Sequence, residues 1–179
     1  LKVAAGLMPP DRVSVTLRGD DLGTLGERRM LEFRRINGFV FQDGALWENK
    51  SIFDNLALPL QVHCSELGEA EIRARVLAML ARGGLADSPA LRPAQLSGGE
   101  RKIASFLRAA ITDPRVVFLD EPTLSIDHTM AELITGMIRD LKARGCTILA
   151  VTHDPRLASL VADRLAVIDA GRLIAEGPF

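Results

Sequence analysis

VVFLDEPT, residues 116–123, ends a fully apolar run with two adjacent carboxylates, Asp120 and Glu121. A second apolar run, TILAVTH at residues 147–153, follows an amphipathic segment with helical periodicity from Met130 to Arg144. A parallel sheet that is covered on both faces requires fully apolar strands joined by helical crossovers. The sequence therefore predicts an α/β core that contains these two runs as strands.

The composition is that of one folded domain. The chain has 179 residues, of which 47% are hydrophobic, and this length and content suffice for a sizeable core. The net charge is −1 and the 22 basic residues are spread along the chain, so nucleic acid is not expected as a partner. No apolar run approaches the roughly 20 residues of a membrane span, and Cys64 and Cys146 are too isolated for a disulfide framework or a metal site. We therefore expect a cytoplasmic chain.

Asp120 and Glu121 leave the end of a buried strand, which is where open α/β sheets place ligand-binding groups. Two adjacent carboxylates are costly to desolvate unless a cation or hydrogen bonds compensate their charge. In phosphoryl-transfer sites one such carboxylate holds Mg²⁺ and another polarises the attacking water. From these two residues alone, the alternative that they only cap the following segment has equal weight.

The stretch LSGGE, residues 96–100, precedes the helical run RKIASFLRAAI. Ser97 and Glu100 have the spacing of a capping box, which is sufficient to start a helix. Gly98 and Gly99 are not explained by capping, because each glycine costs roughly 1 kcal/mol relative to alanine inside a helix. Since bare N–H groups at a helix start bind anions, contact with a phosphate is favoured over capping alone.

Two further polar residues are candidates for the same site. His153 ends the second apolar run, so it is expected at the sheet edge that carries Asp120 and Glu121. Gln42 follows the apolar run Phe39–Phe41, and its amide is able to reach a metal or a water. The alternatives, a structural histidine and an unremarkable loop glutamine, stay open for each residue taken singly.

The remaining elements follow from periodicity. Residues from Ser51 to about Thr112 are helical in pattern, most clearly where one face carries Ile72, Val76, Leu77 and Leu80. Val13–Leu17 and Ile36–Phe41 are candidate strands, which we expect in a peripheral antiparallel element. Two alternating runs around Ala170–Gly171, within residues 164–177, predict a hairpin.

The order and spacing of these motifs resemble the nucleotide-binding domain of an ATP-binding cassette (ABC) ATPase over essentially the whole chain. The resemblance implies a P-loop NTPase (RecA-like) parallel-sheet core with an ABC-type helical subdomain. It implies one partial nucleotide-binding domain over residues 1–179, with the helical subdomain at residues 51–115 and the core strands and C-terminal hairpin at residues 116–179.

The same resemblance implies a role for each motif residue, with ATP and Mg²⁺ as ligands. Residues 96–100 correspond to the signature motif, and Asp127 corresponds to the D-loop aspartate. The residues implied to bind nucleotide are Gln42, Ser97, Gly98, Gly99, Glu100 and Asp127, those implied to hold Mg²⁺ are Asp120 and Gln42, and those implied to act in catalysis are Glu121 and His153.

ATPases of this kind also carry a phosphate loop, G-x-x-x-x-G-K-[ST]. None of the fifteen glycines here is followed by lysine. Leu1–Met8 is similar to the end of the helix that follows this loop, so the loop and the first strands are expected to be missing, and Lys2 is expected to be a helix residue. We expect the 179-residue chain by itself to be inactive as an ATPase.

Residues 41–60, FQDGALWENKSIFDNLALPL, are similar to the ATPases of Mla-type phospholipid transporters, which serve lipid-binding MCE proteins. This similarity implies a peripheral position on the cytoplasmic face of the bacterial inner membrane. It also implies contact with a transmembrane permease near Ala45, Leu46 and Trp47. The alternative for Trp47, simple core packing, has equal weight.

We expect the complete protein to hydrolyse ATP as a dimer, with each ATP between Asp120 of one subunit and Ser97–Gly99 of a second nucleotide-binding subunit. Closing and opening of this sandwich is expected to drive transport through the membrane partner. The alternative is a degenerate, non-hydrolysing subunit or gene fragment that offers only its signature face to an active partner. A DNA-repair or chromosome ATPase is excluded, because the interval from Gln42 to Ser97 has no room for a coiled-coil insertion.

Overall fold

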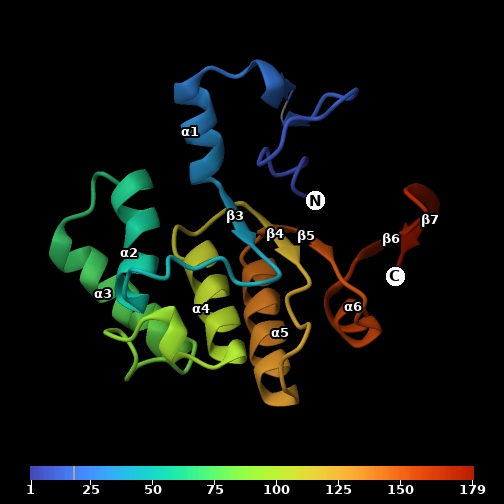
Figure 1. Cartoon of the computed structure of the whole chain (residues 1–179). Helices are drawn as coiled ribbons and strands as arrows, with labels where there is room; N and C mark the ends of the chain where they lie inside the picture. Colours follow the sequence, from blue (N-terminus) through green and yellow to red (C-terminus); the bar gives the residue numbers. More distant parts are fainter. Residues whose placement is uncertain (18) are drawn as a thin grey trace.

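The centre of the molecule is a three-stranded parallel sheet of order β3-β4-β5 (Figure 1). The computed structural model describes residues 1–17 and 19–179. The strands are β3 at Asn37–Val40, β4 at Val116–Asp120 and β5 at Thr147–Val151. Both apolar runs therefore form neighbouring strands, and the predicted α/β core is confirmed.

The third strand of this sheet corrects our expectation for Ile36–Phe41. These residues do not form a peripheral antiparallel element, because β3 pairs in parallel with β4 from Asn37 opposite Val116 onward. Helix α4, Gly98–Ala110, packs directly on this strand at Gly38. A Cβ at Gly38 would lie 2.4 Å from the carbonyl oxygen of Ala109, so the missing side chain is what allows this close approach.

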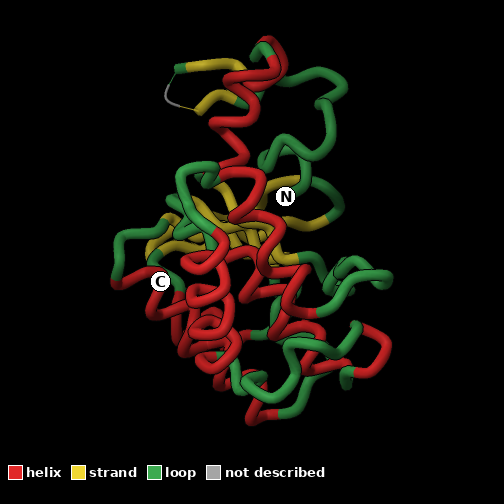
Figure 2. The backbone as a smooth tube through the Cα atoms, turned by 90° about the vertical axis from the view of Figure 1, so that its left-hand side faces the viewer, coloured by secondary structure: helices red, strands yellow, loops and turns green. Residues whose placement is uncertain are grey.

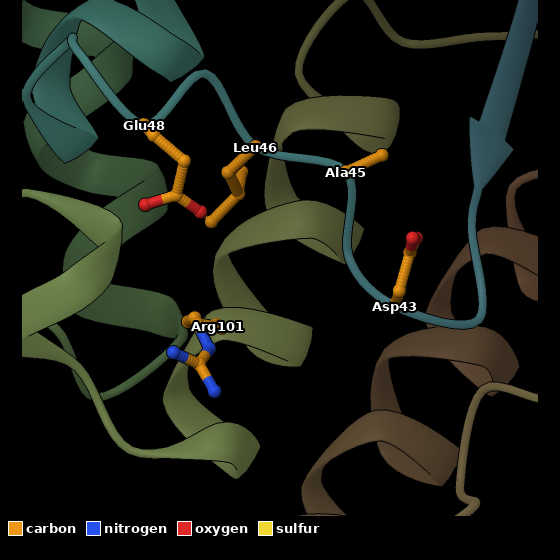
Figure 3. A pocket seen from close by; sticks show the side chains of 5 residues that line it. All are labelled: Asp43, Ala45, Leu46, Glu48 and Arg101. Carbon is orange, nitrogen blue, oxygen red and sulfur yellow. The ribbon is translucent and has the colours of Figure 1, made fainter.

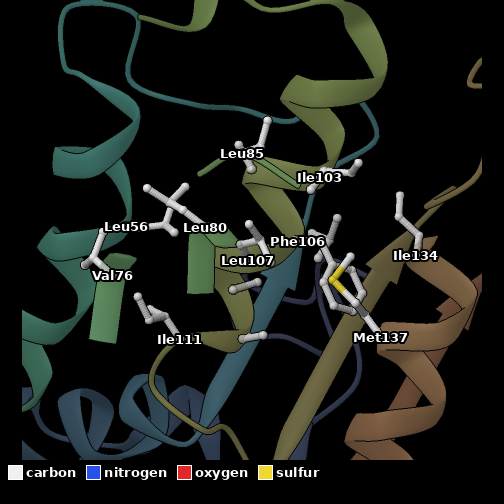
Figure 4. Packing of buried hydrophobic residues seen from close by; sticks show 14 of the residues in the cluster. Leu56, Val76, Leu80, Leu85, Ile103, Phe106, Leu107, Ile111, Ile134 and Met137 are labelled. Atoms are coloured by element: carbon white, nitrogen blue, oxygen red, sulfur yellow. The ribbon is translucent and has the colours of Figure 1, made fainter. Parts of the chain in front are cut away.

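Helices α2 to α5 lie together on one side of the sheet (Figures 1 and 2). Their bounds are α2 at Ile52–His63, α3 at Glu69–Arg82, α4 at Gly98–Ala110 and α5 at His128–Ala143, with a short 3-10 turn, η2, at Pro93–Gln95. Side chains from all four helices form one apolar cluster with the sheet, which Figure 4 shows around Phe106 and Met137. The helical pattern of residues 51–112 is confirmed, although Leu77 is 37% exposed and does not share the buried face of Val76 and Leu80.

The N-terminal residues form the end of a helical turn. The Leu7 N–H donates to Lys2 O and the Gly6 N–H donates to Val3 O, each at 3.0 Å, with Gly6 at φ +66°. This pair of bonds, with a left-handed glycine, is the Schellman motif that ends many helices. The geometry agrees with the interpretation of Leu1–Met8 as a helix end.

A small antiparallel pair and a short helix follow the N-terminal turn. The strands are β1 at Thr16–Leu17 and β2 at Asp20–Asp21, followed by η1 at Leu22–Thr24 and α1 at Glu27–Arg35. The strand expected at Val13–Leu17 is thus shorter than predicted.

The C-terminal part comprises α6 at Pro155–Val161 and a hairpin of β6 at Arg164–Asp169 and β7 at Arg172–Pro178. Ala170 and Gly171, at φ +45° and +75°, form the turn between these strands, so the predicted hairpin is confirmed. Over residues 1–17 and 19–179, no helix has both the length and the apolar character needed to cross a bilayer.

Candidate functional site

The carboxyl ends of the three parallel strands gather four of the predicted residues at one edge of the sheet. Asp120 is the last residue of β4 and pairs with Val151 of β5, and His153 follows two residues later. Gln42 lies just beyond β3 and is exposed. The parallel register therefore brings Gln42, Asp120, Glu121 and His153 to the same edge, which the sequence predicted for His153 and the two carboxylates but not for Gln42.

Glu121 is held in an unusual backbone conformation. Its φ is +48°, in the left-handed region that is unfavourable for residues other than glycine. Its N–H donates to Val151 O at 2.9 Å, which extends the hydrogen bonding between β4 and β5 by one residue. The residue is only 7% exposed, which places its carboxylate in a largely dry position.

His153 orients the Glu121 carboxylate. The backbone N–H of His153 donates to Glu121 Oε2 at 3.2 Å, and His153 Nε2 lies 3.5 Å from Oε1. The imidazole itself is 94% exposed, so it is open to a ligand outside the chain. The alternative that Glu121 caps the following segment is wrong, because its carboxylate faces His153 and the next helix begins only at His128.

Asp127 is the residue that caps this next helix. Its Oδ1 accepts the Met130 N–H at 3.0 Å at the start of α5. Between Glu121 and Asp127 the loop is bonded to the residue that follows His153, because Thr123 Oγ1 donates to Asp154 Oδ2 at 3.0 Å. Ser125, at φ +60°, is a second left-handed residue in this loop.

The signature stretch forms the expected helix start. The Glu100 N–H donates to Ser97 Oγ at 3.2 Å, and the Ser97 N–H donates to Glu100 Oε2 at 2.8 Å, so the capping box is formed. The hydrogen bonds from Ser97 lower the pKa of the Glu100 carboxyl. The fold therefore already employs this carboxylate as part of a helix cap, as it employs the Asp127 carboxylate at the start of α5.

Gly98 and Gly99 differ in what surrounds them. A Cβ at Gly99 would lie 3.2 Å from Met130 Cγ, so packing of α4 against α5 accounts for this glycine. A Cβ at Gly98 would meet nothing within 4 Å, so packing within the chain does not require glycine there. As first-turn donors, the N–H groups of both glycines have no intrahelical acceptor and are available to an anion.

The two parts of the predicted site are separate within this chain. Among the described residues, no hydrogen bond or ion pair joins Ser97, Gly98 or Gly99 to the carboxylates at the sheet edge. The first turn of α4 lies instead beside the start of α5, where Gly99 meets Met130.

The loop after Gln42 is fixed by two buried polar residues that the sequence reasoning missed. Arg108 Nη1 donates to Ala45 O at 2.9 Å, and its guanidinium lies 5.0 Å from the centre of the Trp47 ring. Asn55, fully buried, accepts the Trp47 N–H at 2.8 Å and donates to Trp47 O at 3.1 Å. A polar residue at an otherwise apolar helical position was the signal for Asn55.

Trp47 itself is 45% exposed, so its interpretation as simple core packing is wrong. Its two neighbours in the sequence, Leu46 and Glu48, line a cavity of about 320 Å³ together with Arg101 (Figure 3). Asp43 and Ala45 complete the lining. The segment that follows Gln42 therefore presents a hollow and, at Trp47, an exposed aromatic.

Within residues 1–17 and 19–179, no three histidine, cysteine or acidic side chains cluster as a metal-binding group. Asp120 and Gln42 offer oxygen ligands of the kind that Mg²⁺ prefers. Mg²⁺ typically takes one or two protein ligands and fills its remaining positions with substrate phosphates and water. A sparse oxygen set at the sheet edge fits that ion.

Comparison with known proteins gives the same family along most of the chain. The family described as ABC transporter matches residues 1–124. The chain is 35% identical over 179 residues to the "Probable ribonucleotide transport ATP-binding protein mkl" of Mycobacterium tuberculosis, covering 99% of this chain and 50% of that protein. It is 37% identical over 174 residues to the "Methionine import ATP-binding protein MetN" of Mesorhizobium japonicum, covering 97% of this chain and 47% of that protein. The chain thus spans about half the length of the curated relatives it matches.

Solved structures agree with the fold. A bacterial ABC transporter cassette, solved as a dimer, superposes with a TM-score of 0.90 at 26% identity, covering 99% of this chain and 78% of the other. An ATP-binding cassette in a dimeric post-hydrolysis state with ADP and Pi gives a TM-score of 0.90 at 25% identity, with the same two coverages. Motif order, site geometry and these similarities lead to one conclusion: the chain belongs to the ABC transporter family.

Proposed function

We propose that this chain is the ATP-binding subunit of an ABC transporter, in which ATP binding and hydrolysis drive transport through a membrane partner. The observation that carries the proposal is the buried Glu121 carboxylate, which His153 orients at the carboxyl edge of the sheet. A carboxylate held in a dry position beside an exposed imidazole is suited to accept a proton from an attacking water. Both curated relatives are named for transport, which supports this role.

Asp120 and Gln42 would hold Mg²⁺ in this proposal, and Glu121 and His153 would act on the attacking water. Mg²⁺ would supply positive charge that offsets the negative charge developing during phosphoryl transfer. Glu121 would take the proton of the water, and His153 keeps the carboxylate in position through its backbone N–H. The exposed His153 ring would be free to contact the phosphate.

The second half of each ATP site comes from a second nucleotide-binding subunit. Gly98 and Gly99 place N–H groups without an intrahelical acceptor at the start of α4, and no hydrogen bond in the described residues joins them to the carboxylates of their own chain. In this proposal, the nucleotide that binds to these N–H groups is held on its other side by the carboxylate edge of a second subunit. We therefore infer a dimer with two shared sites, and the dimeric cassettes with the same fold support it.

The permease is proposed to contact the hollow in the segment after Gln42, together with Trp47. Ala45 and Leu46 line this hollow, and the next residue in the sequence, Trp47, is exposed. Tryptophan is enriched among the residues that contribute most to protein interfaces. With such a contact the subunit would lie in the cytoplasm, peripheral on the inner face of the membrane. The similarity of residues 41–60 supports phospholipid as the transported substrate and an MCE-type lipid-binding protein as a further partner.

We also propose two parts for the chain, a helical subdomain at residues 51–115 and core strands with a hairpin at residues 116–179. The start of α4 with the signature stretch belongs to the first part, and Glu121 belongs to the second.

The alternative function is a non-hydrolysing subunit that supplies only its Ser97–Gly99 face to an active partner. The two functions differ in whether the carboxylate edge of this chain performs turnover.

Subunit complementation tests the proposal. In the protein expressed from its complete gene, Glu121→Gln and Gly98→Asp are each expected to abolish turnover, because each removes one half of every shared site. Mixing the two variants makes about half of the dimers mixed, each with one intact site, so about a quarter of wild-type turnover should return. The measurement is phosphate release at saturating Mg-ATP.

A matched mixture controls for general effects of mixing. Glu121→Gln with Asp120→Asn alters the same half of the site in both subunits, so mixed dimers contain no intact site and no turnover should return. Recovery in this control, or no recovery with Gly98→Asp, would contradict shared sites. The non-hydrolysing alternative would be favoured if the wild-type protein shows no ATP turnover of its own but raises the ATP turnover of an active homologous subunit.

The 179-residue chain by itself should bind ATP weakly. Most phosphate contacts in this family come from the G-x-x-x-x-G-K-[ST] loop, which the sequence does not contain. We expect a dissociation constant in the range of about 1 mM, corresponding to roughly −4 kcal/mol, and negligible hydrolysis. Isothermal titration calorimetry with Mg-ATP measures this directly. Micromolar affinity or steady turnover by the pure chain would refute the expectation.

A further inference from the structure

A buried lysine lies on the helix that begins at the signature stretch. Lys102, in the second turn of α4, is only 6% exposed. Lysine is almost never fully buried without a partner, because desolvation of the ammonium is costly. Neither the capping of α4 nor the proposed contact with a phosphate employs this side chain.

The Lys102 ammonium faces the loop that follows β4. Its Nζ donates to the backbone carbonyl of Leu124, twenty-two residues further along the chain. Burial lowers the pKa of Lys102, and the nearby Glu121 carboxylate opposes this by raising it. Within the described residues, Nζ has no other hydrogen bond and no ion pair. The side chain thus spans from α4 to the loop of the proposed catalytic carboxylate.

The loop it holds is strained on both sides of the contact. Glu121 and Ser125 have φ values of +48° and +60°, and left-handed residues other than glycine persist only where their surroundings hold them. Leu124 lies between these two residues, and its own N–H donates to Glu121 O at a long 3.3 Å. The hydrogen bond from α4 to the Leu124 carbonyl therefore stabilises the part of the loop in which the backbone is strained and its own hydrogen bond is long.

We propose that Lys102 is a positioning residue for Glu121, which holds loop 121–125 in its strained conformation from the signature helix. In the proposed dimer, α4 contributes to both ATP sites. Its Gly98 and Gly99 bind the nucleotide of one site, and its Lys102 fixes the position of the Glu121 carboxylate that acts in the other site. The inference rests on the proposed function for the role of Glu121, but the contact and its effect on the loop are independent of that role.

Amide hydrogen exchange of the 179-residue chain, resolved by residue, tests the contact without ATP. The probes are three N–H groups whose hydrogen bonds depend on the loop: Glu121 to Val151 O, Leu124 to Glu121 O, and His153 to Glu121 Oε2. The reference amides are those of β4 at residues 117–119. Lys102→Met, which keeps the length of the side chain but removes its charge and donors, should speed exchange of the probes by about tenfold or more.

Lys142→Met is the matched control. Lys142 Nζ also donates to a backbone carbonyl, Val161 O at 2.9 Å, and pairs with Asp163, but away from the loop. This variant should leave the three probes within about twofold of wild type. Lys102→Arg, which keeps the charge and the donors, should restore most of the protection that Lys102→Met loses.

The proposal is overturned if the probes in Lys102→Met stay within about twofold of wild type, or if the β4 amides accelerate as much as the probes. The second outcome would mean that the lysine supports the whole fold. If Lys102→Met does not fold, Lys102→Gln takes its place, and failure of both to fold also assigns the lysine to the fold as a whole.

Turnover of the protein from its complete gene adds a second readout. Lys102→Met should lower kcat by about tenfold with KM for ATP within about twofold, because a displaced base affects the chemical step more than nucleotide binding. Equal changes in kcat and KM would count against positioning. A wild-type protein without ATP turnover would refute the proposed function alone, since amide exchange still decides the role of Lys102.

Discussion

Glu121→Gln is expected to lower ATP turnover by about 100-fold or more while ATP binding persists, because general-base catalysis contributes roughly 10²–10⁴ in rate. The amide oxygen of glutamine is able to accept the His153 N–H as Glu121 Oε2 does, so the loop should keep its position. Only the capacity to accept a proton from water is lost. ATP should therefore stay trapped between the subunits.

Two measurements on the protein expressed from its complete gene check this prediction. Phosphate release gives turnover, and radiolabelled ATP retained through rapid gel filtration gives trapped nucleotide. Glu71→Gln is the matched control, because Glu71 is an exposed carboxylate on α3 that pairs with Arg75 at 2.7 Å and with no other side chain in the described part of the protein. Normal turnover in Glu121→Gln would contradict the role assigned to this carboxylate. A similar loss of turnover in Glu71→Gln would show that the loss does not depend on the position of the carboxylate.

Gly38→Ala is expected to have the largest effect on stability. The new Cβ would lie 2.4 Å from the carbonyl oxygen of Ala109 and 3.1 Å from its carbonyl carbon. Both are backbone atoms inside α4, so no side chain is able to move aside. We expect a loss of about 3 kcal/mol in the free energy of unfolding, at the upper end for overpacked cores, which lowers Tm by about 10 °C in a chain of this size.

Urea denaturation followed by circular dichroism measures the loss, with Gly136→Ala as its control. Gly136 lies within α5, and a Cβ there would meet nothing within 4 Å. Replacing this glycine by alanine should stabilise the chain by up to about 1 kcal/mol, the difference in helix propensity. A Gly38→Ala midpoint at or above that of wild type would show that α4 moves away from β3 without cost.

Much of the site was predictable because its signals are local. An apolar run followed by Asp120 and Glu121 defines a buried strand and what leaves it, and the spacing of Ser97 and Glu100 defines a capping box. His153 was expected at the edge of Asp120 and Glu121 because parallel strands end together, whereas Gln42 was expected only to be able to reach a metal or a water. None of these inferences depends on which distant residue packs or pairs with the segment in the fold.

Two of the omissions, Lys102 and Arg108, involve contacts between distant parts of the chain. Lys102 bonds to a carbonyl in the loop after β4, Arg108 to one in the loop after β3. In the sequence both belong to an ordinary amphipathic helix with a charged face. Burial of a charged side chain depends on what packs over it, which periodicity within one helix does not report.

The sequence by itself therefore determined the α/β class, the two apolar strands, the capped start of α4, the hairpin and the order of motifs that marks the ABC family. Only the tertiary structure decided that residues 37–40 form the third strand of the parallel sheet, that Trp47 is exposed, and that packing explains Gly99 but not Gly98. The physical reason is the range of the interactions. Periodicity and capping act within a few residues of one segment, whereas strand partners and close backbone approach depend on the register between segments that only the folded chain brings together.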